Sequence, residues 1–258
     1  MDSSPLLFPP DRLAGLAFDL PLDEWQMTLA ERCTLATLVR AVAPAHAIEV
    51  GTARGGSLAV IARFAGRVYS IDHDPACAER LALRHANVEF LTGPSAALLP
   101  ALLDRLAAAG APLAFALIDG SHSREAVRGD IEALLSYRPI VPLHVLIHDS
   151  FHPACRQGIL SARWAENPYV HAVDLDLIPG SLHADPRWYR QLFDGFAAAL
   201  LLPTERTGPL VIRRSRQLEY DALLLRSIWS PRPLERLRAR VDAHRVGSAA
   251  RAAARPRA

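Results

Sequence analysis

Hydrophobic and polar positions follow two different periods through the middle of the chain. Short apolar runs of strand length occupy residues 47–50, 67–71, 88–91, 113–118 and 141–147. Segments with apolar positions at helical spacing lie between them, at residues 57–64, 75–84, 95–109 and 124–137. This regular alternation predicts right-handed βαβ units. We therefore expect an α/β fold with a mostly parallel sheet and helices on both faces.

The rhythm changes after residue 150. A helix is predicted at residues 153–164, and strands are predicted at residues 169–177, 196–202 and 210–213. The last two strands are joined by the turn-rich sequence PTERTGP. Strands that follow one another this closely predict an antiparallel pair at the edge of the sheet.

Helical segments flank this region on both sides. A helix is predicted over residues 23–42, and Pro44 ends it. We divide the chain into an N-terminal helical extension (1–44), a ligand-binding domain (45–215) and a C-terminal helix with a basic tail (216–258). The arginines of the tail fit either a nucleic-acid or membrane surface or an amphipathic helix. No aromatic residue lies among them for base stacking, which favours the helix and predicts neither nucleic acid nor membrane as a partner.

Composition narrows the class of protein further. Half of the 258 residues are hydrophobic, yet no run of 18 apolar residues occurs and no leader sequence is evident, so a cytoplasmic location is expected. The three cysteines are scattered without a CxxC motif, which argues against a disulfide framework or a structural zinc site. The sequence contains no lysine, so no lysine can act as a general base or form a Schiff base.

A glycine-rich loop follows the first predicted strand. Glu49 precedes Gly51, and Gly55, Gly56 and Ser57 open the next helix. Glycines allow a close backbone approach to a ligand, and the helix N-terminus offers free N–H groups. The spacing is GxxxGG and not the GxGxxG of dinucleotide-binding proteins, which predicts a wider loop around a ligand other than a pyrophosphate.

The ends of the next two strands carry further candidate ligands. Asp72 lies 21 residues after Gly51, where a carboxylate can accept both hydroxyl hydrogens of a ribose. Asp72 can instead cap the following helix, although Asp74 is better placed because it directly precedes Pro75. Ser95, after the third strand, can bond a base edge or cap its own helix.

Together these motifs resemble class I S-adenosylmethionine (SAM)-dependent methyltransferases. The resemblance covers roughly residues 25–165 and rests on EVGTARGGS, SIDHDP, VEFLTGPS, LIDGSHSREAVRGD and IHDS, in that order. The match is nearest to small-molecule O-methyltransferases of the catechol type and to relatives that act on sugars and antibiotics. It implies a Rossmann-like sheet of seven strands with SAM as the cofactor. The cofactor-binding residues it implies are Glu49, Gly51, Thr52, Gly55, Ser57, Asp72, His73, Ser95 and Asp119.

The same resemblance implies where the chemistry takes place. Acids at the ends of the fourth and fifth strands of such enzymes hold a divalent ion, which here gives Asp119 and Asp149, with His148 beside them, as metal ligands. His122 occupies the position of the general base, which a histidine also fills in the sugar O-methyltransferases. His148 departs from the usual pattern, because histidine is a poor magnesium ligand and suits manganese better. A metal-free site that uses His122 with His148 or His152 therefore stays open.

The predicted reaction is methyl transfer from SAM to a hydroxyl group of a small molecule. A sugar-containing natural product or glycan is favoured over a phenol as the acceptor, because a histidine fills the base position. Two alternatives are a non-catalytic SAM-binding protein of the same fold and, less well supported by the loop spacing, a nicotinamide-dependent oxidoreductase. Aromatic residues after the core, among them Trp188 and Phe193, fit either an acceptor pocket or the core. Homo-oligomerisation stays open.

Overall fold

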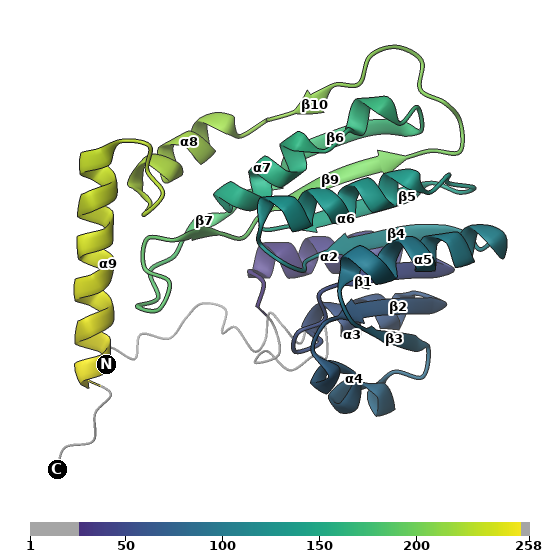
Figure 1. The fold of residues 1–258 in the computed structure, drawn as a ribbon, viewed down its shortest axis with the longest axis horizontal. Coiled ribbons are helices and arrows are strands. Elements are labelled where there is room, and N and C mark those ends of the chain that lie inside the picture. The colour runs from purple at the N-terminus through teal and green to yellow at the C-terminus, as the bar shows by residue number, and fades with distance from the viewer. Residues whose placement is uncertain (1–25, 254–258) are drawn as a thin grey trace.

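The structure of the chain is a computed structural model that describes residues 26–253. A twisted eight-stranded sheet forms its centre, with helices on both faces (Figure 1). The strand order is β10-β6-β9-β5-β4-β1-β2-β3. The strands are β1 His46–Val50, β2 Arg67–Asp72, β3 Val88–Thr92, β4 Leu113–Ile118, β5 Leu143–His148, β6 Val170–Ile178, β9 Phe196–Leu201 and β10 Ile212–Arg213. The Rossmann-like α/β fold predicted from the sequence is confirmed, with eight strands where seven were expected.

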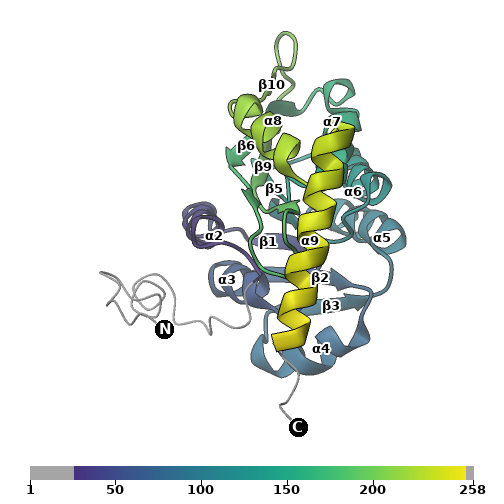
Figure 2. The ribbon, with the colours of Figure 1, turned by 90° about the vertical axis from the view of Figure 1, so that its left-hand side faces the viewer.

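Two layers of helices cover the sheet (Figure 2). The helices of the central region are α2 Leu29–Val42, α3 Gly56–Phe64, α4 Pro75–Leu81, α5 Ser95–Ala108, α6 Arg124–Ser136 and α7 Pro153–Ser161. Alternate residues of β4 enter different cores: Phe115 and Leu117 pack in the cluster that contains α2 and α3, whereas Ala116 and Ile118 pack with α5 and α6. The helices therefore bury both faces of β4, as the continuous apolar run predicted.

The antiparallel part of the sheet differs from the prediction in its pairing. β9 runs antiparallel to the sheet, but it lies between β5 and β6 and pairs with both of them. The PTERTGP link does not form a hairpin, because it crosses the start of β6 and leads to β10, which pairs parallel to β6. Arg206 of the link fixes this path by donating to the backbone carbonyls of Ala165 and Asn167.

The C-terminal part of the chain adds elements at the carboxyl edge of the sheet. A hairpin of β7 Ser181–Leu182 and β8 Leu192–Phe193 and the helix α8 Gln217–Arg226 were not predicted. The predicted C-terminal helix is α9 Pro233–Ala253, which stands across this edge in Figure 2. No helix among residues 26–253 combines the length and the apolar character that a membrane span requires.

A buried arginine attaches α8 to the sheet. Arg156 of α7 donates to Asp176 of β6 at 2.8 Å and to Gln217 at 2.9 Å. Its guanidinium also lies 4.2 Å from the ring centroid of Tyr220. Arg156 and Asp176 are 3% and 2% exposed, so each charge depends on the other for compensation.

We expect Arg156→Ala to lower the free energy of unfolding by about 3–5 kcal/mol, because it leaves the carboxylate of Asp176 buried without its partner. The measurement is equilibrium unfolding in urea. The matched control is Arg128→Ala, which removes an exposed arginine that bonds Glu132 on the same helix, and its unfolding midpoint should stay near that of the wild type. Equal midpoints for both variants would contradict the role given to Arg156.

Candidate active site

The glycine loop is shaped by contacts that only glycine permits. Gly51 adopts a φ of 91°, and a Cβ atom there would lie 1.9 Å from the backbone oxygen of Asp119. Gly55 adopts a φ of 90° at the N-cap of α3. The loop therefore turns tightly against the end of β4, and the free N–H groups of α3 face the carboxyl edge of the sheet.

Asp72 anchors this loop to the second strand. One carboxylate oxygen accepts the backbone N–H groups of Thr52 at 2.8 Å and Ala53 at 3.0 Å, and the other accepts that of Asp74 at 2.9 Å. Burial alone raises the pKa of Asp72, but these three bonds outweigh it and lower the pKa below its usual value. Asp74 caps α4 by accepting the N–H of Ala76, as the sequence predicted.

Glu49 lies fully buried behind the loop. Its carboxyl group accepts hydrogen bonds from Ser57 at 2.7 Å and Ser70 at 2.9 Å. Burial raises the pKa of Glu49 to about 8, although both serines oppose the shift. The group is therefore largely neutral near pH 7, and Ser70 also shares a hydrogen bond of 2.6 Å with Thr52.

The remaining predicted cofactor residues lie farther along the same edge. His73 is exposed, with its Nδ1 atom 3.4 Å from Asp72. Ser95 is the first residue of α5, whose N-cap is Pro94, and its hydroxyl bonds the buried Asp130 rather than capping the helix. A narrow pocket brings the loop residues Gly51–Ser57 together with Met27 and Asp119. A larger pocket of about 390 Å³ lies between the end of α6 and the start of β6, at the amino edge, and contains none of these residues.

An accessible histidine contacts a buried carboxylate next to Asp119, which lines the pocket of the glycine loop. The Nε2 atom of His122 lies 2.8 Å from Asp149, and the two side chains are 50% and 6% exposed. The bond to Asp149 raises the pKa of His122. Burial would raise the pKa of Asp149, but His148 and His122 hold it well below its usual range. The geometry is that of a general base oriented by a carboxylate.

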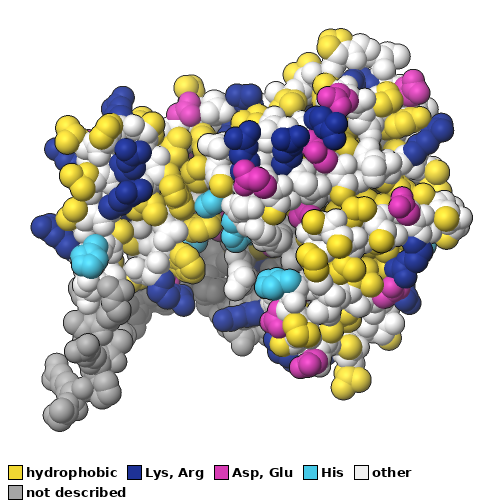
Figure 3. Space-filling view, in the orientation of Figure 1, with side chains coloured by type: hydrophobic (Ala, Val, Ile, Leu, Met, Phe, Trp, Pro, Cys, Tyr) yellow, Lys and Arg dark blue, Asp and Glu magenta, His cyan; other side chains and the backbone are white. Residues whose placement is uncertain are grey.

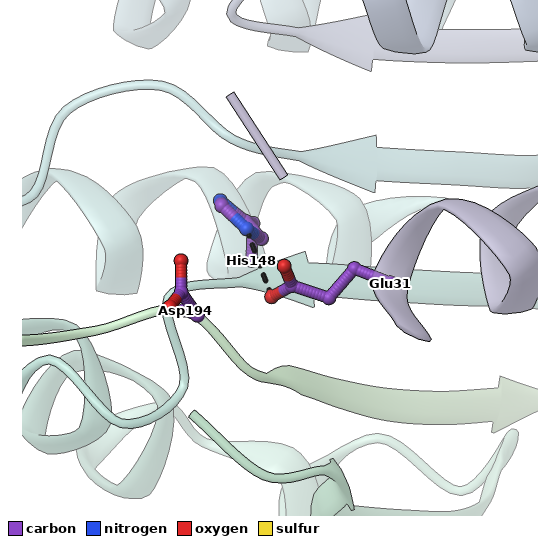
Figure 4. A group of neighbouring side chains, drawn as sticks. All are labelled: Glu31, His148 and Asp194. Atoms are coloured by element: carbon purple, nitrogen blue, oxygen red, sulfur yellow. Dashed lines mark hydrogen bonds and ion pairs between the residues drawn. The ribbon is translucent and has the colours of Figure 1, made fainter. Parts of the chain in front are cut away.

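His148 lies behind this pair and is bonded on both ring nitrogens. Nδ1 lies 2.9 Å from Asp119, and Nε2 lies 3.1 Å from Glu31 of α2 (Figure 4). Burial opposes protonation, yet Asp119 and Asp149 raise the pKa of His148 well above its usual value. An imidazole that forms a hydrogen bond to a carboxylate with each of its two nitrogens carries a proton on both.

Glu31 and Asp194 are site residues that the sequence analysis missed. Glu31 forms a capping box with Thr28 at the start of α2, and the Thr-x-x-Glu spacing was a detectable signal for that role. Its other carboxylate oxygen accepts the N–H of Gly195 at 2.6 Å. Asp194 donates its own N–H to Asp149 at 2.7 Å. Both pairings join segments far apart in the sequence, so local patterns gave no sign of them.

The predicted metal ligands fall into two groups. Ligand atoms of Asp119, His122 and Asp149 lie within 4.8 Å of one another, whereas His148 gathers with Glu31 and Asp194. The first group mixes nitrogen and oxygen donors, a set that fits manganese better than magnesium. In the second group the carboxylate of Asp194 already bonds Ser181 and His183, and that of Glu31 accepts the N–H of Gly195.

Aromatic and histidine rings, His122 among them, surround Phe193. His152 stacks on Phe193 with a centroid separation of 5.0 Å, and Trp188 and Trp229 approach it edge-on at 5.9 Å each. Trp164, another aromatic residue that follows the predicted parallel strands, is buried in the core instead. In Figure 3 histidine side chains gather in the hollow between the lobe that carries α9 and the body of the molecule.

Part of the chain matches a known protein family. Residues 48–150 match a family model described as "Methyltransferase domain". This segment contains the glycine loop, Asp72, Asp119, His122 and Asp149. No curated protein sequence matches the chain.

Solved structures share the fold at low sequence identity. The O-methyltransferase TomG of Streptomyces achromogenes, involved in tomaymycin synthesis and bound to SAM, is 22% identical with a TM-score of 0.52, covering 76% of this chain and 92% of its own. An O-methyltransferase of Bacillus cereus in complex with SAH is 19% identical with a TM-score of 0.51, covering 74% and 87%. The cofactor-bound protein Rv0187 from MTB is 22% identical with a TM-score of 0.52, covering 75% and 87%.

The neutral state of Glu49 has a measurable effect on stability. Its folded pKa of about 8 lies above the usual 4.5, so its contribution to stability is complete below pH 4.5 and is lost as the pH rises to about 8. We expect the unfolding free energy of ligand-free Glu49→Gln to fall less than that of the wild type across this range, by on the order of a few kcal/mol.

The measurement is urea unfolding at a series of pH values. Glu89→Gln is the control, because Arg105 and Arg67 lower the pKa of Glu89 and its contribution changes only at acidic pH. Parallel pH curves for the wild type and Glu49→Gln would mean that Glu49 is ionised in the folded protein.

Proposed function

We propose that the chain, whose residues 48–150 match a methyltransferase domain, is a class I SAM-dependent methyltransferase that methylates a hydroxyl group of a small molecule with His122 as the general base. The observation that carries the proposal is the pair of an accessible His122 and a buried Asp149. The chain contains no lysine for this role. A sugar-containing natural product or glycan is the favoured acceptor class.

In this proposal SAM lies along the carboxyl edge of β1, β2 and β4. The methionine part contacts Gly51 and Ser57, with Glu49 behind them. The ribose hydroxyls bond Asp72, whose oxygens retain lone pairs beyond those that hold the loop. His73 and Ser95 lie toward the adenine. Thr52, Gly55 and Asp119 complete the contacts.

The reaction requires one proton transfer and one substitution. The Nε2–H of His122 donates to Asp149, which leaves the Nδ1 atom as the base that removes the proton from the acceptor hydroxyl, and Asp149 stabilises the imidazolium that forms. The oxygen lone pair then attacks the methyl carbon of SAM in line with the sulfur. The carbon–sulfur bond breaks, its electron pair stays on sulfur, and the products are a methyl ether and S-adenosylhomocysteine (SAH). Most of the acceleration comes from alignment of the two reactants.

Asp119, His122 and Asp149 are the residues that would hold a divalent ion of the manganese type. Such an ion would lower the pKa of the acceptor hydroxyl and so make its deprotonation easier. The hydrogen bonds of His148 to Asp119 and of His122 to Asp149 already compensate these carboxylates, which favours the metal-free route.

Cofactor binding is the first test of the proposed function. We expect SAH to bind the purified protein and Asp72→Asn to weaken that binding at least tenfold, because the variant loses the ribose-binding charge. The measurement is isothermal titration calorimetry. Asp74→Asn is the matched control, since asparagine caps a helix as well as aspartate and lies two residues away. Equal SAH affinity in both variants would overturn the position proposed for the ribose.

The role of His122 predicts a pH dependence with a definite sign. Asp149 raises the pKa of His122, so the neutral base appears only as the pH rises through that raised value. We expect Asp149→Asn to lower the pKa of His122. We expect His122→Gln to reduce turnover by about 10²–10⁴-fold and to retain its affinity for SAH. NMR titration of the His122 ring in the SAH complex measures the pKa. Unchanged turnover in His122→Gln would exclude it as the base.

A further inference from the structure

The C-terminal helix α9 carries an apolar stripe that the rest of the described chain leaves uncovered. Leu234, Leu237 and Val241 are 71%, 60% and 40% exposed. Their spacing of three and four residues places the three side chains on one face of the helix. The opposite face meets the body of the molecule, because Ala239 on that face is fully buried. The stripe therefore points away from the rest of the protein.

Arginines border this stripe on both sides. At about 100° per residue, Arg238 and Arg245 lie on one side of it and Arg240 lies on the other, and all three are exposed. The long apolar part of an arginine side chain can lie along a nonpolar surface while its guanidinium reaches a polar layer. The outward face of α9 is thus apolar in its centre and basic at its borders.

The acids of α9 lie away from the stripe. The helix contains five arginines and two acids. Asp242 bonds Arg190, in the segment between β7 and β8, at 3.2 Å, and this ion pair attaches α9 to the body of the molecule. Glu235 lies on the same side of the helix as Asp242, and its carboxylate is 3.0 Å from Arg238. The excess of positive charge therefore remains beside the apolar stripe.

This combination of apolar and basic side chains selects the kind of partner. A second copy of the chain would bring its arginines against those of the first, so like charges oppose the pairing of two such stripes. A nucleic acid would bond the arginines through its phosphates but would leave the leucines without an apolar partner. An anionic lipid surface accommodates both, because its headgroups attract arginine and its acyl chains accept aliphatic side chains.

We propose that α9 lies on an anionic lipid surface, with Leu234, Leu237 and Val241 inserted between the headgroups. The helix lies parallel to the surface and does not span the bilayer. The sequence alone predicted no membrane partner, because it does not reveal which face of the helix the body covers. In Figure 2 α9 stands across the carboxyl edge of the sheet, so this edge faces the lipid. The proposal is independent of the methylation reaction.

Co-sedimentation of the full chain with lipid vesicles tests the proposal. The vesicles consist of phosphatidylcholine alone or with about 30% phosphatidylglycerol, at low and at high salt. We expect the wild type to bind the anionic vesicles at least about tenfold more tightly than the neutral ones, and high salt to weaken this binding. The leucine variant, Leu234→Ser with Leu237→Ser, should bind about tenfold more weakly, because two aliphatic side chains are no longer buried in lipid.

Leu83→Ser with Leu218→Ser is the matched control, because these leucines are 100% and 87% exposed and neither lies on α9. This control should bind the anionic vesicles as the wild type does. The arginine variant, Arg240→Gln with Arg245→Gln, should bind more weakly and with a smaller dependence on salt. Circular dichroism and unfolding in urea establish that every variant is folded.

Other outcomes would overturn the proposal. Equal binding of anionic and neutral vesicles, or equal binding by the leucine variant and the wild type, would exclude the stripe as a lipid anchor. A wild-type dimer in analytical ultracentrifugation that becomes a monomer in the leucine variant would assign the stripe to a second copy of the chain. Binding of duplex DNA without binding of vesicles, lost in the arginine variant and kept in the leucine variant, would assign the arginines to nucleic acid.

Discussion

Negative charge at the carboxyl edge of the sheet has to be compensated in the absence of lysine. Glu31, Asp149 and Asp194 are all buried, and an unpaired carboxylate at such depth costs several kcal/mol, about 3–5 when a partner is removed. The chain pairs each of them with a histidine: His148, His122 and His183. His148 is buried among these pairs, whereas His122 and His183 remain partly accessible.

The turn at Asp194 illustrates how tightly this compensation constrains the backbone. Gly195 has a φ of 90°, and a Cβ atom there would lie 2.9 Å from the hydroxyl of Ser150 and from the backbone of Gly180. Its N–H group bonds Glu31, and that of Asp194 bonds Asp149. One short turn thus satisfies two buried carboxylates, which stabilises left-handed backbone that would otherwise be unfavourable.

The sequence predicted the features that depend on local patterns. The alternating periods located every strand from β1 to β5, and the loop after β1 was recognised because its glycines precede a helix at fixed spacing. The pairing of β9 with β5 and β6 was missed, because it joins strands that are far apart in the sequence. Glu31 was missed as a site residue for the same reason, since its partners His148 and Gly195 lie 117 and 164 positions away. The roles of the individual site residues stay predictions.

One carboxylate both starts α2 and bonds the buried histidine. Glu31 closes the capping box with Thr28 and also contacts His148, so the helix start and the candidate active site share a single group. Thermodynamic linkage then requires that proton binding at His148 and docking of α2 influence each other by the same free energy. Any ligand or partner that shifts the N-terminal segment would therefore act as an effector of the active-site charge, and occupation of the active site would in turn alter the stability of that helix.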